Sequence, residues 1–149
     1  MPRFTYGDNI VALPHAAATL FDEALADDIC RAARTSAIVI VTPGEEDDAP
    51  TLPRIRRKLY LTFDDIEADE HVAYGGRTLE TISPLEARAA ADFADTSEEL
   101  VVTCAGGISR SAGIVAGILA ATGGDDRALY RTKHPNATCR RLVMQAMGA

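Results

Sequence analysis

The chain has 149 residues, of which 47% are hydrophobic and 25% charged, and its formal net charge is −7. That length is typical of one globular domain with its own core, so we expect residues 1–149 to form a single domain. The acidic balance argues against nucleic-acid and anionic-membrane partners, which select basic surfaces. No apolar run reaches the roughly 18 residues of a membrane span. The first residues lack the apolar centre of a signal peptide. The three cysteines are widely spaced and form no C-x2-C pair, so we expect no metal site. Their odd number also argues against a disulfide framework, and we therefore expect a reduced, cytoplasmic protein.

The first half of the chain predicts one long helix and two strands. Apolar residues recur at helical spacing over 19–34, beneath an acidic outer face. The β-branched run at 37–42 is typical of a central strand, and the alternating residues at 58–63 indicate a second. Residues 43–54 and 64–82 have the composition and irregular pattern of loops.

The second half predicts a strand and a buried helix among capped helices. Ser83, Pro84 and Glu86 form the pattern of an N-cap, first helical position and capping box, which predicts a helix to about Ala94. The remaining predicted elements are a strand over 99–103, an almost wholly apolar helix over 111–122, and helices over 125–132 and 136–147, the last capped by Asn136. Strands that alternate with helices indicate an α/β fold, with a central, mainly parallel sheet flanked by helices and ligands at the carboxyl ends of its strands.

The candidate site is the loop 104–110, Cys-Ala-Gly-Gly-Ile-Ser-Arg, between the strand 99–103 and the helix 111–122. Successive amides before a helix form a nest for an anion, and the helix N-terminus adds a partial positive charge. A helix N-terminus and a nearby arginine lower the pKa of a thiol, so Cys104 is a candidate nucleophile. Arg110 offers a planar fork that fits two phosphoryl oxygens, and we expect the Ser111 hydroxyl to bond the Cys104 sulfur. The predicted phosphate-binding residues are Ala105, Gly106, Gly107, Ile108, Ser109 and Arg110, with positive φ expected at the two glycines.

The run VVTCAGGISRSAG resembles the signature loop of cysteine-dependent protein tyrosine phosphatases, in which five residues separate Cys from Arg and a Ser or Thr follows. The likeness is closest to the dual-specificity branch and to small bacterial members, and it is strong over about 99–122. It implies a tyrosine phosphatase-like fold and hydrolysis of phosphotyrosine through a cysteinyl-phosphate, with phosphoserine and phosphothreonine left open. It also implies no cofactor, a phosphorylated protein or peptide as partner, and inorganic phosphate as product. Thr103 stands where the family usually has His, and its hydroxyl is a substitute for part of that residue's role.

The resemblance also implies an upstream aspartate that protonates the leaving oxygen. Asp64 and Asp65 follow the strand 58–63, and their Phe-Asp-Asp pattern is similar to an acid loop in which the second acid is the catalyst. We therefore predict Asp65 as the general acid, with Asp64 as the alternative, while solvated loop acids stay open as an interpretation. Pro135-Asn136 resembles a feature of the bacterial members and is assigned no catalytic role.

Other functions and roles stay open from the sequence. A non-catalytic phosphate-binding module fits Thr103, and a rhodanese-like sulfurtransferase also uses a cysteine loop, although the spacing to Arg110 argues against it. The neutral residues at 105–109 disfavour a polyphosphoinositide substrate. The only basic cluster is interpreted as a solvated loop or, alternatively, as a docking patch beside the phosphate site; it consists of Arg54, Arg56, Arg57 and Lys58.

The remaining histidines and cysteines are expected to have no role in the reaction. Structural or exposed positions are expected for His15, His71 and His134. Core positions are expected for Cys30 and Cys139, and a disulfide between one of them and Cys104 under oxidation stays open.

Overall fold

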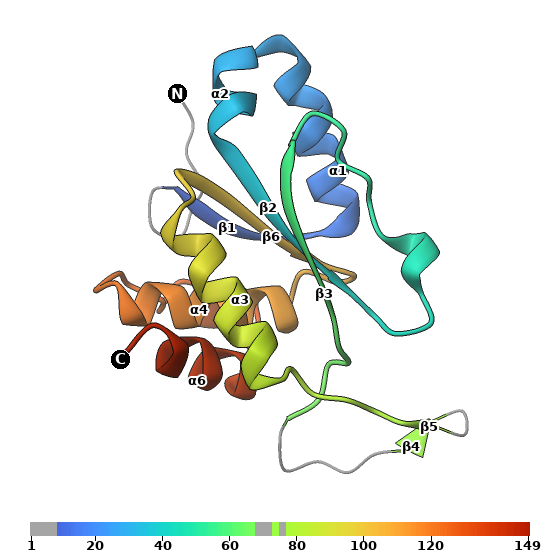
Figure 1. Cartoon of the computed structure of the whole chain (residues 1–149), viewed down its shortest axis with the longest axis vertical. Coiled ribbons are helices and arrows are strands. Elements are labelled where there is room, and N and C mark those ends of the chain that lie inside the picture. Colours follow the sequence, from blue (N-terminus) through green and yellow to red (C-terminus); the bar gives the residue numbers. More distant parts are fainter. Residues whose placement is uncertain (1–8, 68–72, 75–76) are drawn as a thin grey trace.

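A computed structural model describes residues 9–67, 73–74 and 77–149. At its centre lies a four-stranded sheet in the order β1-β6-β2-β3, in which every neighbouring pair is parallel (Figure 1). The strands are β1 (Ile10–Pro14), β2 (Thr35–Val41), β3 (Arg57–Thr62) and β6 (Glu99–Cys104). A separate antiparallel pair joins β4 (Ala73–Tyr74) and β5 (Arg77–Thr78). The predicted α/β fold with a parallel central sheet is confirmed.

Helices cover both faces of this sheet (Figure 1). One face carries α1 (His15–Ala24), a 3-10 turn (Leu25–Asp27) and α2 (Ile29–Arg34). The other carries α3 (Pro84–Asp95), α4 (Arg110–Ala121), α5 (Leu129–Thr132) and α6 (Ala137–Ala146). A second 3-10 turn (Glu46–Asp48) lies in the loop after β2. Within the described residues, no helix is long and apolar enough to cross a membrane.

The central strand β2 explains why the sheet is covered on both sides. All seven of its residues are buried. Ile38 and Ile40 contribute to the larger core beneath α3, α4 and α6, whereas Ala37, Val39 and Val41 belong to the smaller core beneath α1. Successive side chains of a strand point to opposite faces, so an unbroken β-branched run fills both cores.

Two helices begin as the sequence predicts. The Ser83 hydroxyl accepts from the Glu86 N–H at 3.1 Å, and the Glu86 carboxylate accepts from the Ser83 N–H at 3.0 Å, so the capping box of α3 is complete. The Asn136 side chain accepts from the Cys139 N–H at 3.0 Å and caps α6. In α4, ten of twelve residues are buried, as expected from its apolar sequence.

Two predicted helices differ in the structure. The single helix over 19–34 is wrong, because Asp28 leaves the helical conformation at φ −141° and caps α2 by accepting from the Arg31 N–H at 3.0 Å. The helix over 125–132 is only Leu129–Thr132, because the Asp125 carboxylate accepts from the Arg127 N–H and guanidinium and holds the preceding residues in a turn. Strand β1 was not expected, and its pairing with β6 places its last residue beside Cys104.

Candidate active site

The loop 104–110 lies at the carboxyl end of β6, where the sequence places the site. Cys104 ends β6 and is 2% exposed, and Arg110 begins α4. Gly107 has φ +65°, and a Cβ there would lie 2.2 Å from the Pro14 nitrogen, so the back of the loop rests on the end of β1. Gly106 has no positive φ, so the expectation for that glycine is wrong. The close approach to β1, not the turn alone, requires glycine at 107.

The outer side of the loop is held through its carbonyl groups. Lys133 Nζ donates to the Gly107 carbonyl at 2.6 Å, and the His134 and Asn136 N–H groups donate to the Ile108 and Ser109 carbonyls at 3.0 and 2.9 Å. In a trans peptide the N–H points opposite to the carbonyl. The N–H groups of Ile108 and Ser109 therefore point away from this bracing segment, and no described residue accepts from them. Such free, aligned donors are what a bound oxyanion requires.

Cys104 and Ser111 meet at the start of α4. Their Sγ and Oγ atoms lie 3.2 Å apart, and the Ser111 N–H donates to Sγ at 3.5 Å. Both side chains are buried. A thiol can donate to the hydroxyl, but once the sulfur loses its proton only the hydroxyl can donate. Ser111 is thus placed to stabilise an anionic sulfur.

Arg110 is buried and connects the loop to the segment after β3. Its Nη1 donates to the Phe63 carbonyl at 2.8 Å. Phe63 begins a short segment, residues 63–67, which we call the acid loop because it contains both predicted acids. The Arg110 side chain therefore contacts the acid loop, while its backbone belongs to the loop 104–110.

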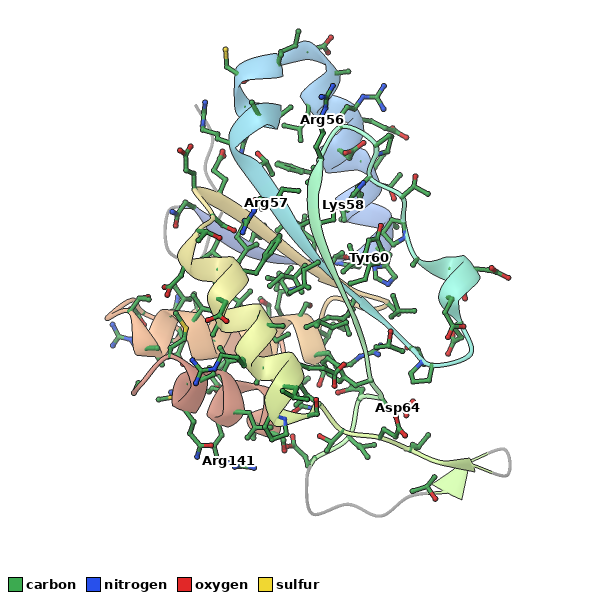
Figure 2. The ribbon with its side chains drawn as sticks, viewed as in Figure 1. Arg56, Arg57, Lys58, Tyr60, Asp64 and Arg141 are labelled. Carbon is green, nitrogen blue, oxygen red and sulfur yellow. The ribbon has the colours of Figure 1, made fainter. Side chains whose placement is uncertain are left out.

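Asp64 and Asp65 have different environments. Asp65 is exposed, and its Oδ1 accepts from Ser109 Oγ at 2.6 Å and from Asn136 Nδ2 at 3.1 Å. Asp64 is 4% exposed at the end of β3 (Figure 2), and its Oδ2 accepts from the Glu80 N–H at 2.8 Å. Its own N–H donates to the Glu80 carbonyl at 2.7 Å. The structure brings Asp65 to the loop 104–110, whereas Asp64 fastens the chain that returns after the β4–β5 pair.

Sequence reasoning missed two residues that join the acid loop to α6. Asn136 was predicted only as a helix cap, yet its Nδ2 also donates to Asp65 and to the Ile66 carbonyl at 3.0 Å. The Glu67 carboxylate accepts from the Ala137 and Thr138 N–H groups at 3.0 and 2.9 Å. Both partners lie about half the chain away in sequence, so no local pattern could reveal them.

Thr103 has a partner that the sequence also did not indicate. Its fully buried hydroxyl lies 3.0 Å from Nδ1 of His15, the first residue of α1. Burial lowers the pKa of His15 below 6.5, and the Arg110 charge lowers it further, while a backbone hydrogen bond with Ile40 and the Asp48 charge oppose them. A neutral imidazole therefore supports the base of the loop at neutral pH. His15 has the structural role expected of it, His134 is exposed, and His71 lies outside the described residues.

The other cysteines separate into one buried and one exposed thiol. Cys139 is fully buried, as expected, and burial raises its pKa, with the Asp65 and Glu67 charges adding to the effect and Arg110 opposing it. Cys30 lies on the exposed side of α2, so its expected core position is wrong. Within the described residues the three cysteines are free, and no group of three His, Cys, Asp or Glu could hold a metal ion.

The basic cluster does not lie beside the loop 104–110. Arg56 and Arg57 lie at the opposite end of β3 from Asp64 (Figure 2), because Arg57 pairs with Ser36 at the start of β2. Arg57 is also held within the fold: its guanidinium lies 3.9 Å from the Phe93 ring centroid and donates to Ser97 Oγ at 2.7 Å. Of the two interpretations of this cluster, the docking patch beside the candidate site is therefore wrong.

Comparison with known proteins gives one structural likeness. No family model matches the chain, and no curated protein matches it. The crystal structure of a human tyrosine phosphatase-like serine/threonine/tyrosine-interacting protein superposes with a TM-score of 0.66 over 99% of this chain and 97% of that one, at 20% sequence identity. The fold is tyrosine phosphatase-like. At that identity the likeness extends to the fold, and the chemistry has to be argued from the residues of this chain.

Proposed function

We propose that the protein is a phosphatase that hydrolyses phosphotyrosine in proteins or peptides, with phosphoserine and phosphothreonine as further candidate substrates. The proposal depends on one observation: Asp65 is hydrogen-bonded to Ser109 of the same loop that carries Cys104 and Arg110. A nucleophile, an oxyanion-binding arginine and an acid from a distant segment therefore meet at one place. That combination is what phosphoryl transfer to a thiol requires.

Binding places the phosphoryl group over the sulfur. The free N–H groups of Ile108 and Ser109, the N-terminus of α4 and the Arg110 guanidinium supply the positive potential for its equatorial oxygens. Phosphoryl transfer depends mainly on such positioning and charge stabilisation. The neutral residues 105–109 add no further charge, which favours a single phosphate monoester over a polyphosphorylated headgroup.

The reaction proceeds in two steps. The Cys104 thiolate attacks phosphorus, an S–P bond forms and the P–O ester bond breaks, while Asp65 gives its proton to the leaving oxygen. Water then attacks phosphorus and gives a proton to Asp65, the S–P bond breaks, and inorganic phosphate leaves. The Ser111 hydroxyl, 3.2 Å from the sulfur, stabilises the thiolate that this second step releases. Besides water and the substrate, the scheme uses only side chains and N–H groups of this chain. We propose that the reaction takes place in the reducing cytoplasm, where cysteine thiols persist.

Hydrolysis of 4-nitrophenyl phosphate and of a phosphotyrosine peptide tests the proposal. Cys104→Ser should abolish turnover, and Asp65→Asn should lower the rate for the peptide by about 10²–10⁴-fold. Asp64→Asn is the matched control, because an asparagine oxygen still accepts from the Glu80 N–H, and it should retain most of the activity. Equal losses in Asp64→Asn and Asp65→Asn would contradict the assignment.

The second candidate function is that of a phosphate-binding module without turnover. The observation that favours it is the residue before Cys104: Thr103, which stands where the family usually has histidine, is hydrogen-bonded to His15 at the base of the loop. Isothermal titration calorimetry that detects binding of tungstate or a phosphotyrosine peptide, together with no hydrolysis by the unsubstituted protein, would favour the binding module over the phosphatase. A thiosulfate–cyanide assay distinguishes both from a sulfurtransferase.

A further inference from the structure

We propose that Asn136 is a positioning residue that orients the carboxyl group of Asp65, so that Oδ2 carries the proton given to the leaving oxygen. This inference rests on the proposed function. It adds to the site a residue that does not touch the substrate and that lies on neither the acid loop nor the loop 104–110.

Asn136 is 2% exposed and links three parts of the fold. Its Nδ2 donates to Asp65 Oδ1 at 3.1 Å and to the Ile66 carbonyl at 3.0 Å. Its Oδ1 accepts from the Cys139 N–H at 3.0 Å, and its backbone N–H donates to the Ser109 carbonyl at 2.9 Å. Every polar group of this buried side chain is therefore paired, which fixes its rotamer.

The chemistry of these partners fixes which way the amide faces. The Cys139 N–H can only donate, so the atom opposite it must be the Asn136 oxygen, and the Ile66 carbonyl can only accept, so the atom opposite it must be the nitrogen. Nδ2 therefore presents a hydrogen to Asp65 Oδ1. The Ser109 hydroxyl at 2.6 Å is a second donor to the same oxygen.

The Asn136 amide decides where the acid's own proton lies, because its nitrogen can only donate. A proton on Oδ1 would face the amide hydrogen of Asn136, so the protonated acid carries its proton on Oδ2, and the Ser109 hydroxyl, which can donate or accept, donates to Oδ1. Oδ2 is then the only oxygen of Asp65 able to give a proton to the leaving group. The general acid is thus oriented before substrate binds, which lowers the cost of reaching the reactive geometry.

The position of the acid loop is secured separately from this orientation. The Glu67 carboxylate accepts from the Ala137 and Thr138 N–H groups and from the Thr138 hydroxyl at 2.8 Å. The Phe63 carbonyl accepts from Arg110 at the other end of the loop. With both ends anchored, removal of the Asn136 amide should release the carboxyl group of Asp65 without releasing the loop.

The test compares two substrates that differ in their need for a proton. The 4-nitrophenolate of 4-nitrophenyl phosphate leaves readily without protonation, whereas the phenolate of phenyl phosphate, with a pKa of about 10 like that of tyrosine, does not. Asn136→Ser keeps a side-chain acceptor at the N-cap of α6, because serine is among the best N-caps, but removes both amide donors. We expect its kcat for phenyl phosphate to fall about 10- to 100-fold and its kcat for 4-nitrophenyl phosphate to fall much less.

Two further variants separate orientation from folding. Ser109→Ala removes the other donor to Asp65 and should show the same selective loss to a smaller extent. Thr138→Val removes one of three hydrogen bonds to Glu67 but keeps the Ala137 and Thr138 N–H donors that anchor the acid loop, so the ratio of the two rates should not change. Urea unfolding of each variant shows how much of any loss follows from stability alone.

The positioning role would be overturned by the following combination: Asp65→Asn keeps its selective loss, while Asn136→Ser and Ser109→Ala lose kcat equally for the two substrates or lose none for either substrate. Absence of a selective loss in Asp65→Asn would overturn both this role and the general-acid assignment. Turnover that survives in Cys104→Ser would overturn the proposed function itself, so the three failures are distinguishable.

Discussion

Replacement of Gly107 by alanine tests whether the loop 104–110 takes its shape from its seat on β1. The added Cβ would lie 2.2 Å from the Pro14 nitrogen, 2.5 Å from Pro14 Cδ and 2.6 Å from the Leu13 carbonyl carbon. Two of these atoms are backbone in a sheet strand, so they cannot move aside cheaply. Overpacking of this kind costs typically about 1–3 kcal/mol. The left-handed backbone at φ +65° adds roughly 1–2 kcal/mol for a residue with a Cβ.

Gly106→Ala is the matched control one residue away. Gly106 has no positive φ and no atom within 4 Å of an added Cβ. An alanine there should be neutral or stabilise the fold by up to about 1 kcal/mol through the unfolded chain. Gly107→Ala should instead lose about 2–5 kcal/mol, which at a urea m-value of about 2 kcal/mol/M lowers the midpoint by about 1–2.5 M. Equal midpoints for the two variants, or a larger loss in Gly106→Ala, would refute the reasoning.

Further predictions concern pH, capping and thiol reactivity. Because the pKa of His15 is lowered below 6.5 in the folded state, the unfolded chain binds the extra proton, and folding stability should fall as pH drops below about 6.5. Urea unfolding at about pH 5 and about pH 8 should show a weaker pH dependence in His15→Asn, and an unchanged dependence would contradict this source. Ser83→Ala should lower the free energy of unfolding by about 1 kcal/mol through loss of the α3 cap, unless the hydrogen bond to Glu86 contributes nothing. Brief alkylation of the folded protein followed by peptide mapping should label exposed Cys30 and spare Cys139, whose pKa is raised by burial, and labelling of Cys139 before unfolding would contradict its burial.

Local patterns in the sequence were sufficient to predict the central parts of the fold. The β-branched run of β2 and the apolar run of α4 each report burial directly, because both faces of these elements are covered. The Ser83–Glu86 and Asn136 caps are local hydrogen bonds with sequence signatures, and both occur as predicted. The strand, loop and helix order around Cys104 follows from the same kind of local information.

Features that depend on contacts distant in sequence could not be predicted. Strand β1 is five residues long and ends in proline, and its place follows from pairing with β6. The contact between His15 and Thr103 spans 88 positions, and the one between Asp65 and Asn136 spans 71. Asp64 and Asp65 are adjacent acids in one loop, and contacts distant in sequence distinguish them: Asp64 contacts Glu80, whereas Asp65 contacts Ser109 of the loop 104–110.

The most direct measurement of the central claim is the mass of the intact protein after acid quench during turnover of 4-nitrophenyl phosphate. Asp65→Asn should slow the second step, because water then has no base, and let the intermediate accumulate. We predict a species heavier by one phosphoryl group, with the modification on Cys104, and its absence when Cys104→Ser is combined with Asp65→Asn. Steady release of 4-nitrophenol with no covalent species at any quench time, or a phosphoryl group on another residue, would contradict attack by the Cys104 sulfur.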